Sequence, residues 1–525
     1  MRVPCETISR SAAAEIPCAE SSRVWVLTAT ILASSMAFID STAINVALPA
    51  LQKTLHATVV DVQWVVESYG LFLGALILVG GTLGDVLGRR RVFVIGTILF
   101  AAASAACAVA PSIQILIAAR SMQGVGAALL VPGSLVIIST SFDEKSRGEA
   151  IGTWSGWTAI TTAIGPVLGG WLVEHASWRG VFIINLPLAA AVVGISIWRV
   201  PESRSQVASR VDWSGAVLAT AGLGALVFGF IESSSLGWRN PLVFGSLVAA
   251  LVFLPGFAAF EVRSSFPMVP LGLFRNRNFS GANLLTLFLY AAIGVFLFLL
   301  PLNLIQVQQY SATAAGASIL PLILLMFLLS RWSGGLVARY GARKPLVVGS
   351  LVVAFGFLLF VVPSVGADYW KGVFPALIVL GLGMAITVAP LTTDVMNAVE
   401  QDRVGAASGI NNAVARVAGV LGIAVLGIVM VLAFRVRLDH ALGRLSLPPG
   451  ILAGIHAQET RLAAMQPPPS LDAATRAAVT DSIRHAFVFG FRIVMVICAC
   501  LSLASAAVAL IMVPGGGERS QQAAP

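Results

Sequence analysis

Residues 81–91 read Gly81-Thr-Leu-Gly84-Asp85-Val-Leu-Gly88-Arg89-Arg90-Arg91 and lie between two long apolar runs. A weaker copy returns far downstream, as Gly335-Leu-Val-Ala-Arg339-Tyr-Gly341-Ala-Arg343-Lys344, again between two apolar runs. A short basic connection of this kind is typical of neighbouring membrane helices. Because the connection is used twice, the sequence predicts two related halves.

The composition is that of a membrane protein. Of the 525 residues, 57% are hydrophobic and only 11% are charged. A chain with so little polar surface cannot fold around a single core in water, so we expect a polytopic membrane protein. The five cysteines show neither disulfide nor metal-ligand spacing, and we assign them no role.

Fourteen apolar runs are long enough to cross a bilayer, which takes about 20 helical residues. They lie near 24–48, 61–84, 92–110, 112–138, 149–173, 178–198, 213–231, 241–260, 280–303, 311–336, 345–363, 371–391, 404–432 and 487–513. The predicted fold class is therefore an all-α membrane protein.

The two copies of the basic connection divide these runs into two six-helix bundles. Eight spans rather than six separate the copies, so the runs near 213–231 and 241–260 are interpreted as an insertion. The predicted divisions are a tail (1–23), a first bundle (24–198), a linker with two extra helices (199–279), a second bundle (280–513) with a long outer loop (433–486), and a tail (514–525). Parallel repeats of this kind are typical of one class of secondary transporter, with the substrate site between the halves.

The basic residues determine the expected orientation. With the amino terminus in the cytoplasm, 19 Lys and Arg residues fall on the cytoplasmic side and 4 fall in the short outer loops. This bias follows the positive-inside rule and predicts that both termini are cytoplasmic. Topology thus explains the net charge of +9, and no nucleic-acid partner is expected.

Charged residues inside spans are costly and are functional candidates by default. Asp40 and Arg120 lie about eight positions from the outer ends of their helices, at similar depth, so the two side chains could meet. A carboxylate beside a guanidinium can serve as a proton carrier, because water entry or substrate can tip its protonation balance. The alternative is a purely structural buried ion pair.

Further charged residues also lie within predicted spans. Glu67 is a further protonatable candidate, or it extends to the outer surface. Arg416 contacts substrate or, as we favour, ties helices together. Arg331 and Arg492 lie near helix ends and are expected to extend toward the membrane surface.

The fifth predicted span is rich in glycine. Gly152 and Gly156 place small residues on one face, which favours close helix contact, and Pro166 favours a kink. The second half has Leu421-Gly422 where Gly165-Pro166 would be expected, and it has no arginine that answers to Arg120. These features break the repeat, which makes them candidates for a directional function.

At these residues the chain resembles a fourteen-helix member of the major facilitator superfamily, of the drug:proton antiporter-2 type. Residues 81–91 resemble the signature loop of the superfamily, and 116–128 resemble the motif whose arginine, here Arg120, is assigned to proton transfer. Residues 165–170 resemble the antiporter motif, and 39–49 resemble the first-helix motif of the fourteen-helix group. The chain departs from the pattern at Val86 in the first loop and at Ala338 in the second.

The residues in the spans and the resemblance together predict four sets of site residues. Proton coupling is expected at Asp40, Arg120 and Glu67. The antiporter-motif helix carries Gly152, Gly156, Gly165, Pro166, Gly169 and Gly170. The cytoplasmic gate is expected at Gly81, Gly84, Asp85, Gly88, Arg89, Arg90, Gly335, Arg339, Gly341 and Arg343. Cavity positions are expected at Asn45, Gln123 and Arg416.

The implied function is export of small amphipathic compounds from the cytoplasm of a bacterial cell, driven by proton entry and alternating access. We expect protonation and substrate to compete for one cavity carboxylate, with Asp40 as first choice. No cofactor or metal is implied, the proton gradient is the expected energy source, and a monomer is the working expectation.

Three alternatives stay open at this point. The chain is a multidrug exporter, an exporter dedicated to one metabolite, or a non-transporting receptor or scaffold on the same fold. An enzyme is not expected, because the sequence shows no clustered nucleophile and base and no phosphate loop. The segment 433–486 is expected to form an outer hairpin or cap, either a passive spacer or a partner-docking element.

Overall fold

The computed structural model describes residues 20–142, 144–204, 211–399, 404–445 and 447–514. Helices account for nearly all regular structure, and no strand occurs in these ranges. The first half contains α1 (Glu20–Leu55), α2 (Val59–Leu87), α3 (Arg89–Val109), α4 (Ile113–Ser141), α5 (Glu144–His175), α6 (Gly180–Ile183) and α7 (Asn185–Arg199). The inserted pair is α8 (Trp213–Leu236) and α9 (Pro241–Arg263), followed by η1 (Leu271–Arg275). The second half contains α10 (Arg277–Leu302), η2 (Asn303–Val307), α11 (Ala312–Ser318), α12 (Leu320–Tyr340), α13 (Arg343–Leu359), η3 (Tyr369–Val373), α14 (Phe374–Asn397), α15 (Val404–Leu442), α16 (Pro449–His456), η5 (Glu459–Ala464) and α17 (Ala473–Met512).

Each predicted span coincides with one helix or with two consecutive helices. Within the described ranges, 12 helices are long and apolar enough to cross a membrane by length and composition. The two remaining predicted spans fall on α13, which has 17 residues, and on the glycine-rich α5. The all-α membrane fold is thus confirmed, whereas the count of fourteen spans stays a prediction.

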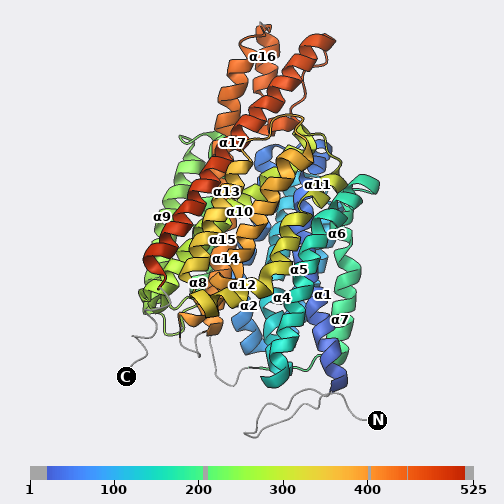
Figure 1. Ribbon diagram of the computed structural model, residues 1–525. Helices are drawn as coiled ribbons and strands as arrows, with labels where there is room; N and C mark the ends of the chain where they lie inside the picture. The colour runs from blue at the N-terminus through green and yellow to red at the C-terminus, as the bar shows by residue number, and fades with distance from the viewer. Residues whose placement is uncertain (1–19, 143, 205–210, 400–403, 446, 515–525) are drawn as a thin grey trace.

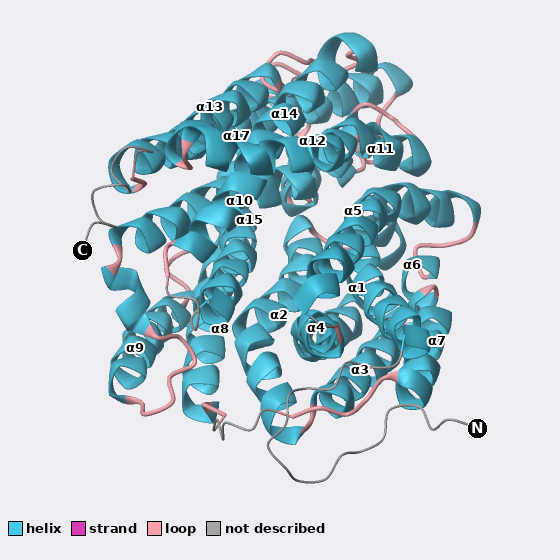
Figure 2. Cartoon of the chain, turned by 60° about the horizontal axis from the view of Figure 1, so that its bottom comes forward, coloured by secondary structure: helices cyan, strands magenta, loops and turns pink. Residues whose placement is uncertain are grey.

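Each half packs mainly on itself. In the first half, α4 packs against α2 and α3, and α1 packs against α5 and α7. In the second half, α14 packs against α12 and α13, and α10 packs against α15 and α17. Figure 2 shows these two groups side by side, with α8 and α9 at one flank. The exact domain boundaries remain predictions.

The inserted helices join the two halves at that flank. Helices α8 and α9 pack closely on each other, and α8 also contacts α2 from the first half and α15 from the second. At the bilayer-facing side of this pair, residues such as Leu251 and Val262 expose most of their side chains. An exposed apolar surface of this kind fits lipid contact.

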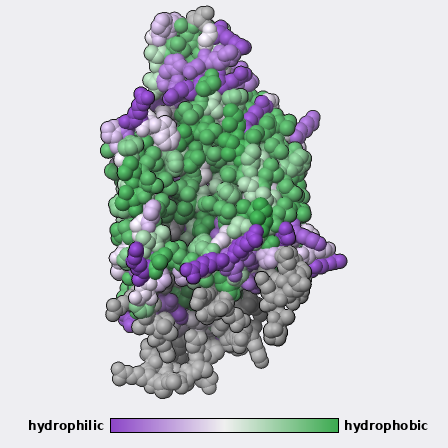
Figure 3. Space-filling view, turned by 90° about the vertical axis from the view of Figure 1, so that its left-hand side faces the viewer, coloured by the Kyte–Doolittle hydropathy of each residue, from purple (hydrophilic) through white to green (hydrophobic). Residues whose placement is uncertain are grey.

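The outer surface has the pattern expected of a membrane-embedded protein. Figure 3 shows an apolar belt around the middle of the visible face, with hydrophilic residues above and below it. Such a belt matches the hydrocarbon core of a bilayer, which is about 30 Å thick. We call the end at which α1 begins and α17 ends the cytoplasmic end, as the charge distribution predicts.

At the opposite end, helices α15 and α17 continue far beyond the apolar belt. They contain 39 and 40 residues, which corresponds to about 60 Å of helix at 1.5 Å per residue. Their protruding ends, together with α16 and η5, form the structure at the top of Figure 1. We call residues 433–486 the outer cap. The expected outer loop is therefore largely helical, because α15 and α17 do not end where their apolar runs end.

Candidate functional site

The most deeply buried charges of the first half form an ion pair. Arg120 on α4 donates from Nη1 to Oδ2 of Asp40 on α1 at 2.5 Å. Relative exposure is 0% for the Asp40 side chain and 1% for that of Arg120. The structure therefore brings together the two residues that the sequence placed at similar depth, and their role in proton coupling stays a prediction.

Polar side chains from two further helices complete this cluster. Oδ1 of Asp40 accepts hydrogen bonds from Gln123 at 2.8 Å and from Asn185 on α7 at 3.0 Å. The amides of Gln123 and Asn185 also donate to Ser104 on α3, at 3.2 Å and 2.9 Å. Both oxygens of the carboxylate are thus hydrogen-bonded, which offsets part of the cost of burying its charge. We call Asp40, Ser104, Arg120, Gln123 and Asn185 the buried polar network.

Arg120 makes additional contacts within the first half. Its Nε donates to the backbone oxygen of Val65 at 3.1 Å, and its guanidinium lies over the ring of Tyr69 at 4.4 Å. The network therefore links α1, α2, α3, α4 and α7. Sequence reasoning missed Ser104 and Asn185, although each is a polar residue inside an apolar run.

A cavity of about 950 Å³ lies between the two halves. Helices α1 and α5 line it from the first half, and α10, α12 and α14 line it from the second. Its polar lining residues are Thr42, Asn45, Ser155, Thr162, Tyr290 and Ser330. The other described lining residues are apolar or glycine, and none of the described set is charged. Cavities of this size and character accept small, mainly apolar ligands.

The cavity does not include all the positions expected there. Asn45 lines it, but Gln123 belongs to the buried polar network, and Asp40 also faces the interior of the first half. The expectation that Gln123 lines the cavity is therefore wrong. Helix α1 contributes to both the buried polar network and the cavity. Asp40 faces the network, and Thr42, two residues later, lines the cavity.

Glu67 on α2 carries a buried carboxyl group. Its exposed fraction is 0%, and neither side-chain oxygen has a hydrogen-bond partner in the described part of the chain. Gln63 and Gly70 are its neighbours on one helix face, and both contact α15. Glu67 therefore lies at an interface between the halves, and the alternative that it extends to the outer surface is wrong.

Arg416 on α15 lies at the same interface, opposite Gly74 of α2. Its Cβ is 3.4 Å from the position that a Cβ on Gly74 would occupy. Tyr69 and Tyr290 are close enough to interact with it electrostatically. Within the described ranges, its Nε has no hydrogen-bond partner. This position fits contact between helices, and a contact with substrate is not tested.

The glycines of α5 fall into two groups. A Cβ on Gly165 or Gly169 would lie within 3 Å of Thr42 or Ala43 on α1, and a Cβ on Gly170 would lie 2.3 Å from the backbone oxygen of Ala312 on α11. These three glycines therefore permit close packing. Among the described residues, nothing lies within 4 Å of a Cβ added at Gly152 or Gly156, and both glycines line the cavity instead. The expectation that they mediate close helix contact is wrong, because at that depth no described residue approaches this face of α5.

The two halves meet at the outer end. Pro166 of α5 packs against Gly316 of α11, where a Cβ would lie 2.0 Å from the proline oxygen. Nearby, the Thr313 hydroxyl donates to Glu174 at 2.6 Å. On the neighbouring helices, Gln306 donates to Gln52 at 2.6 Å. We call these α5–α11 and Gln52–Gln306 contacts the outer seam. The structure is closed there, whereas Gly152 and Gly156 face open space on the cytoplasmic half of α5.

The repeated turns have similar local structures. Gly88 and Gly341 adopt positive φ values of 113° and 73°, which suit glycine at a tight connection between helices. In the first turn, Arg90 donates to the backbone oxygen of Val200, at the end of α7. In the second, Arg343 donates to that of Leu510, near the end of α17. Each turn therefore binds the end of the last helix of its own half.

The remaining charges of the first turn also stay within that half. Arg89 pairs with Asp85 at 2.9 Å, and Glu202, just after α7, lies 3.8 Å from both Arg90 and Arg91. Among the described residues, no ion pair joins the first turn to the second half. The predicted gate role is not tested by this arrangement.

Two arginines near helix ends were expected to extend toward the membrane surface. Arg492 on α17 donates to the backbone oxygens of Val362 and Pro363, which follow α13 at the outer end. It thus ties α17 to a neighbouring connection. The side chain of Arg331 lies outside the described residues.

The amino-acid sequence is similar to those of a known protein family. A sequence model of the Major Facilitator Superfamily matches residues 30–423. The chain belongs to this superfamily. The chain also resembles individual proteins. The Multidrug resistance protein Stp of Mycobacterium tuberculosis is 37% identical over 410 residues, which cover 77% of this chain and 75% of that protein. The Tetracenomycin C resistance and export protein of Streptomyces glaucescens is 33% identical over 497 residues, which cover 93% and 91%.

Solved structures of transporters share the fold. A bacterial homologue of the human lysosomal transporter Spinster, in an inward-facing and unoccupied conformation, aligns with a TM-score of 0.62 at 17% identity. The alignment covers 95% of this chain and 100% of that chain. As a member of the superfamily, with 12 candidate membrane spans in its described part, the protein is a multi-pass membrane transport protein with small-molecule substrates, and not an enzyme.

Proposed function

We propose that the protein exports small amphipathic compounds across a bacterial cell membrane in exchange for protons, by alternating access. The observation that carries this proposal is the cavity between the halves, closed at the outer seam and bordered on α1 by the buried polar network. Two relatives named for drug resistance or export support the direction of transport. A cavity between two halves is where transporters of this architecture bind their substrates.

The cavity lining supports a mainly apolar substrate. Thr42, Asn45 and Tyr290 offer a few hydrogen-bonding groups among aliphatic and aromatic surfaces. An apolar cavity with few polar groups selects by size and hydrophobicity rather than by a fixed set of hydrogen bonds. This favours transport of several related compounds over strict recognition of one metabolite.

Coupling through Asp40 requires a different route from the one the sequence suggested. We propose that proton and substrate bind at separate places, because Asp40 faces the buried polar network rather than the cavity. Protonation of Asp40 would weaken its ion pair with Arg120 and so loosen α1 from α4. Since α1 also carries Thr42 and Asn45, that movement would reshape the cavity. Proton and substrate binding are then linked through the position of one helix.

Glu67 is the second proton site in this proposal. An unpaired carboxylate is so costly to bury that the group takes up a proton instead. Rocking of α2 against α15 would expose Glu67 to water and allow the proton to leave. Each export cycle would then include a change in the protonation of Glu67, at the interface between the halves.

The proposal is tested with purified protein in vesicles carrying a pH gradient and a panel of chemically unrelated compounds. Addition of a transported compound should release protons, and a gradient should drive uptake into inverted vesicles. Asp40→Asn should abolish proton-driven transport while leaving membrane insertion intact. Glu232→Gln, which alters an acidic residue on the inserted helix α8, is the matched control and should transport normally. Unchanged pH-driven transport by Asp40→Asn would remove Asp40 from this role.

A further inference from the structure

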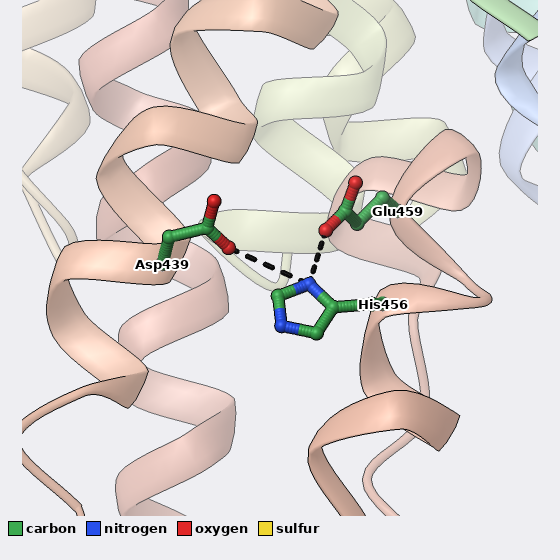
Figure 4. Close-up of side chains that lie close together, drawn as sticks. All are labelled: Asp439, His456 and Glu459. Carbon is green, nitrogen blue, oxygen red and sulfur yellow. Dashed lines mark hydrogen bonds and ion pairs between the residues drawn. The ribbon is translucent and has the colours of Figure 1, made fainter.

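Three potential metal ligands meet in the outer cap. Asp439 lies on the protruding part of α15, His456 is the last residue of α16, and Glu459 begins η5. Figure 4 shows the His456 ring between the two carboxylates, with its Nδ1 directed toward both. Nδ1 is 3.4 Å from Oδ1 of Asp439 and hydrogen-bonds to Oε1 of Glu459. One ligand atom from each of the three residues lies within 4.8 Å of the other two.

These atoms match the donors that a divalent transition metal prefers. Imidazole nitrogen and carboxylate oxygen both bind Zn²⁺ at about 2.0–2.2 Å, and adjacent ligands of a tetrahedral site are then about 3.3–3.5 Å apart. The separation of 3.4 Å between His456 and Asp439 fits such an edge, whereas the hydrogen bond between His456 and Glu459 is shorter than the edge and would open to admit the ion. The Asp439 side chain is about half exposed, at 49%, which leaves room for water as a fourth ligand.

A neighbouring arginine orients one of the ligands. Arg435, one turn before Asp439 on α15, forms an ion pair with Oε2 of Glu459. This contact holds the carboxylate so that Oε1 faces His456, and the Glu459 side chain is mostly buried. The positive charge of Arg435 also opposes a nearby cation, so replacing it with a neutral glutamine, whose amide can still donate to Glu459, should strengthen metal binding.

We propose that Asp439, His456 and Glu459 bind one divalent transition-metal ion, of the Zn²⁺ class, at the outer surface. The ion would join α15, α16 and η5, three consecutive elements of the outer cap. An adventitious hydrogen-bonded cluster is the competing interpretation, in which a protonated His456 bridges two carboxylates without metal.

The position of the site gives metal binding a consequence for transport. Segment η5 packs against α1 and α2, and Arg461 donates to the backbone oxygen of His56, between those helices, at 3.4 Å. The cap therefore extends from the second half onto the first half at the outer end. A metal that fixes η5 to α15 stiffens this bridge and should slow opening of the outer seam. This consequence rests on the proposed alternating access, but metal binding itself does not.

The binding test uses the purified full-length protein in detergent, stripped with a chelator and titrated with Zn²⁺ by equilibrium dialysis with elemental analysis. We expect one tightly bound Zn²⁺ per chain. His456→Ala and Asp439→Asn should each lower the affinity at least tenfold, since loss of even an outer-shell partner costs about 10–100-fold. His440→Ala is the matched control, because His440 is the next residue after Asp439 and pairs with Arg444 instead.

Two further results decide between the interpretations. Arg435→Gln should bind Zn²⁺ more tightly than the parent, provided that size-exclusion chromatography shows a folded protein. Zn²⁺ should slow export by the parent and by His440→Ala but leave His456→Ala unaffected. Absence of stoichiometric Zn²⁺ from the folded parent, or equal binding by parent and His456→Ala, would overturn the site. Binding without any effect on export would overturn only the proposed stiffening of the bridge.

Discussion

Asp40 and Glu67 are both carboxyl groups with no exposed surface, but they differ in their partners. Asp40 accepts hydrogen bonds from Arg120, Gln123 and Asn185, whereas Glu67 has no hydrogen-bond partner among the described residues. Burial of a charge is tolerated only where opposite charge and hydrogen bonds replace water. The environment of Asp40 thus supports an ionised carboxylate, and that of Glu67 supports a neutral one.

This difference predicts that two substitutions affect stability to different extents. Arg120→Gln leaves the charge of Asp40 buried without its ion-pair partner and should lower the free energy of unfolding by about 3–5 kcal/mol. Glu67→Gln replaces a neutral acid with a neutral amide of the same shape and should change it by less than about 1 kcal/mol. Unfolding in detergent, followed by circular dichroism, measures both. A large loss of stability in Glu67→Gln would contradict a neutral Glu67.

At the scale of single elements, α5 has two functions along its length. Its outer part packs closely against α1 and α11 at Gly165, Gly169 and Gly170, where no side chain would fit. Its cytoplasmic part faces the cavity at Gly152 and Gly156. One helix therefore supplies both the outer seam and a wall of the cavity, which is suitable for coupling closure at one end to opening at the other.

Adding a methyl group at the seam should open it. In Gly170→Ala, the new Cβ would meet the backbone oxygen of Ala312 at 2.3 Å, so α5 and α11 must move apart. We expect a membrane-impermeant thiol reagent added from the outer side to label Thr42→Cys, in the cavity, faster in this background. Gly152→Ala meets nothing within 4 Å and is the matched control. Equal labelling in the two backgrounds would show that the seam does not depend on Gly170.

At the scale of the whole molecule, the halves contact each other along two unequal routes. On one side α2 packs against α15, and on the other α5 packs against α11 and α12. Gln52 and Gln306 meet near the outer end, and the outer cap crosses from α15 and α17 to α1 and α2. Outward opening must break the outer seam and the cap contact together.

A cross-link at the outer end should therefore stop transport. Gln52→Cys and Gln306→Cys replace side chains that hydrogen-bond at 2.6 Å, so a short bifunctional thiol reagent can join them. The joined protein should bind substrate from the cytoplasmic side but export none, and a cleavable reagent should restore export after reduction. Each single variant with the same reagent is the control. Full export by the joined protein would contradict movement at this seam.

The sequence by itself determined the membrane class, the repeat and the approximate spans. These depend on apolar length and on charge next to helix ends, which are local properties of the chain. It also placed Asp40 and Arg120 at one depth, because helical rise converts residue number into distance. The superfamily resemblance rested on four short motifs, and the match over residues 30–423 confirms it.

Only the tertiary structure decided which way each side chain faces and what it meets. It assigned Gln123 to the buried polar network, added Ser104 and Asn185, and turned Gly152 and Gly156 toward the cavity. It also brought Asp439, His456 and Glu459 together in the outer cap. Such contacts join residues far apart in the chain or in different segments, and their geometry depends on how helices rotate and cross when they pack. Hydrophobic length alone carries no information about that rotation.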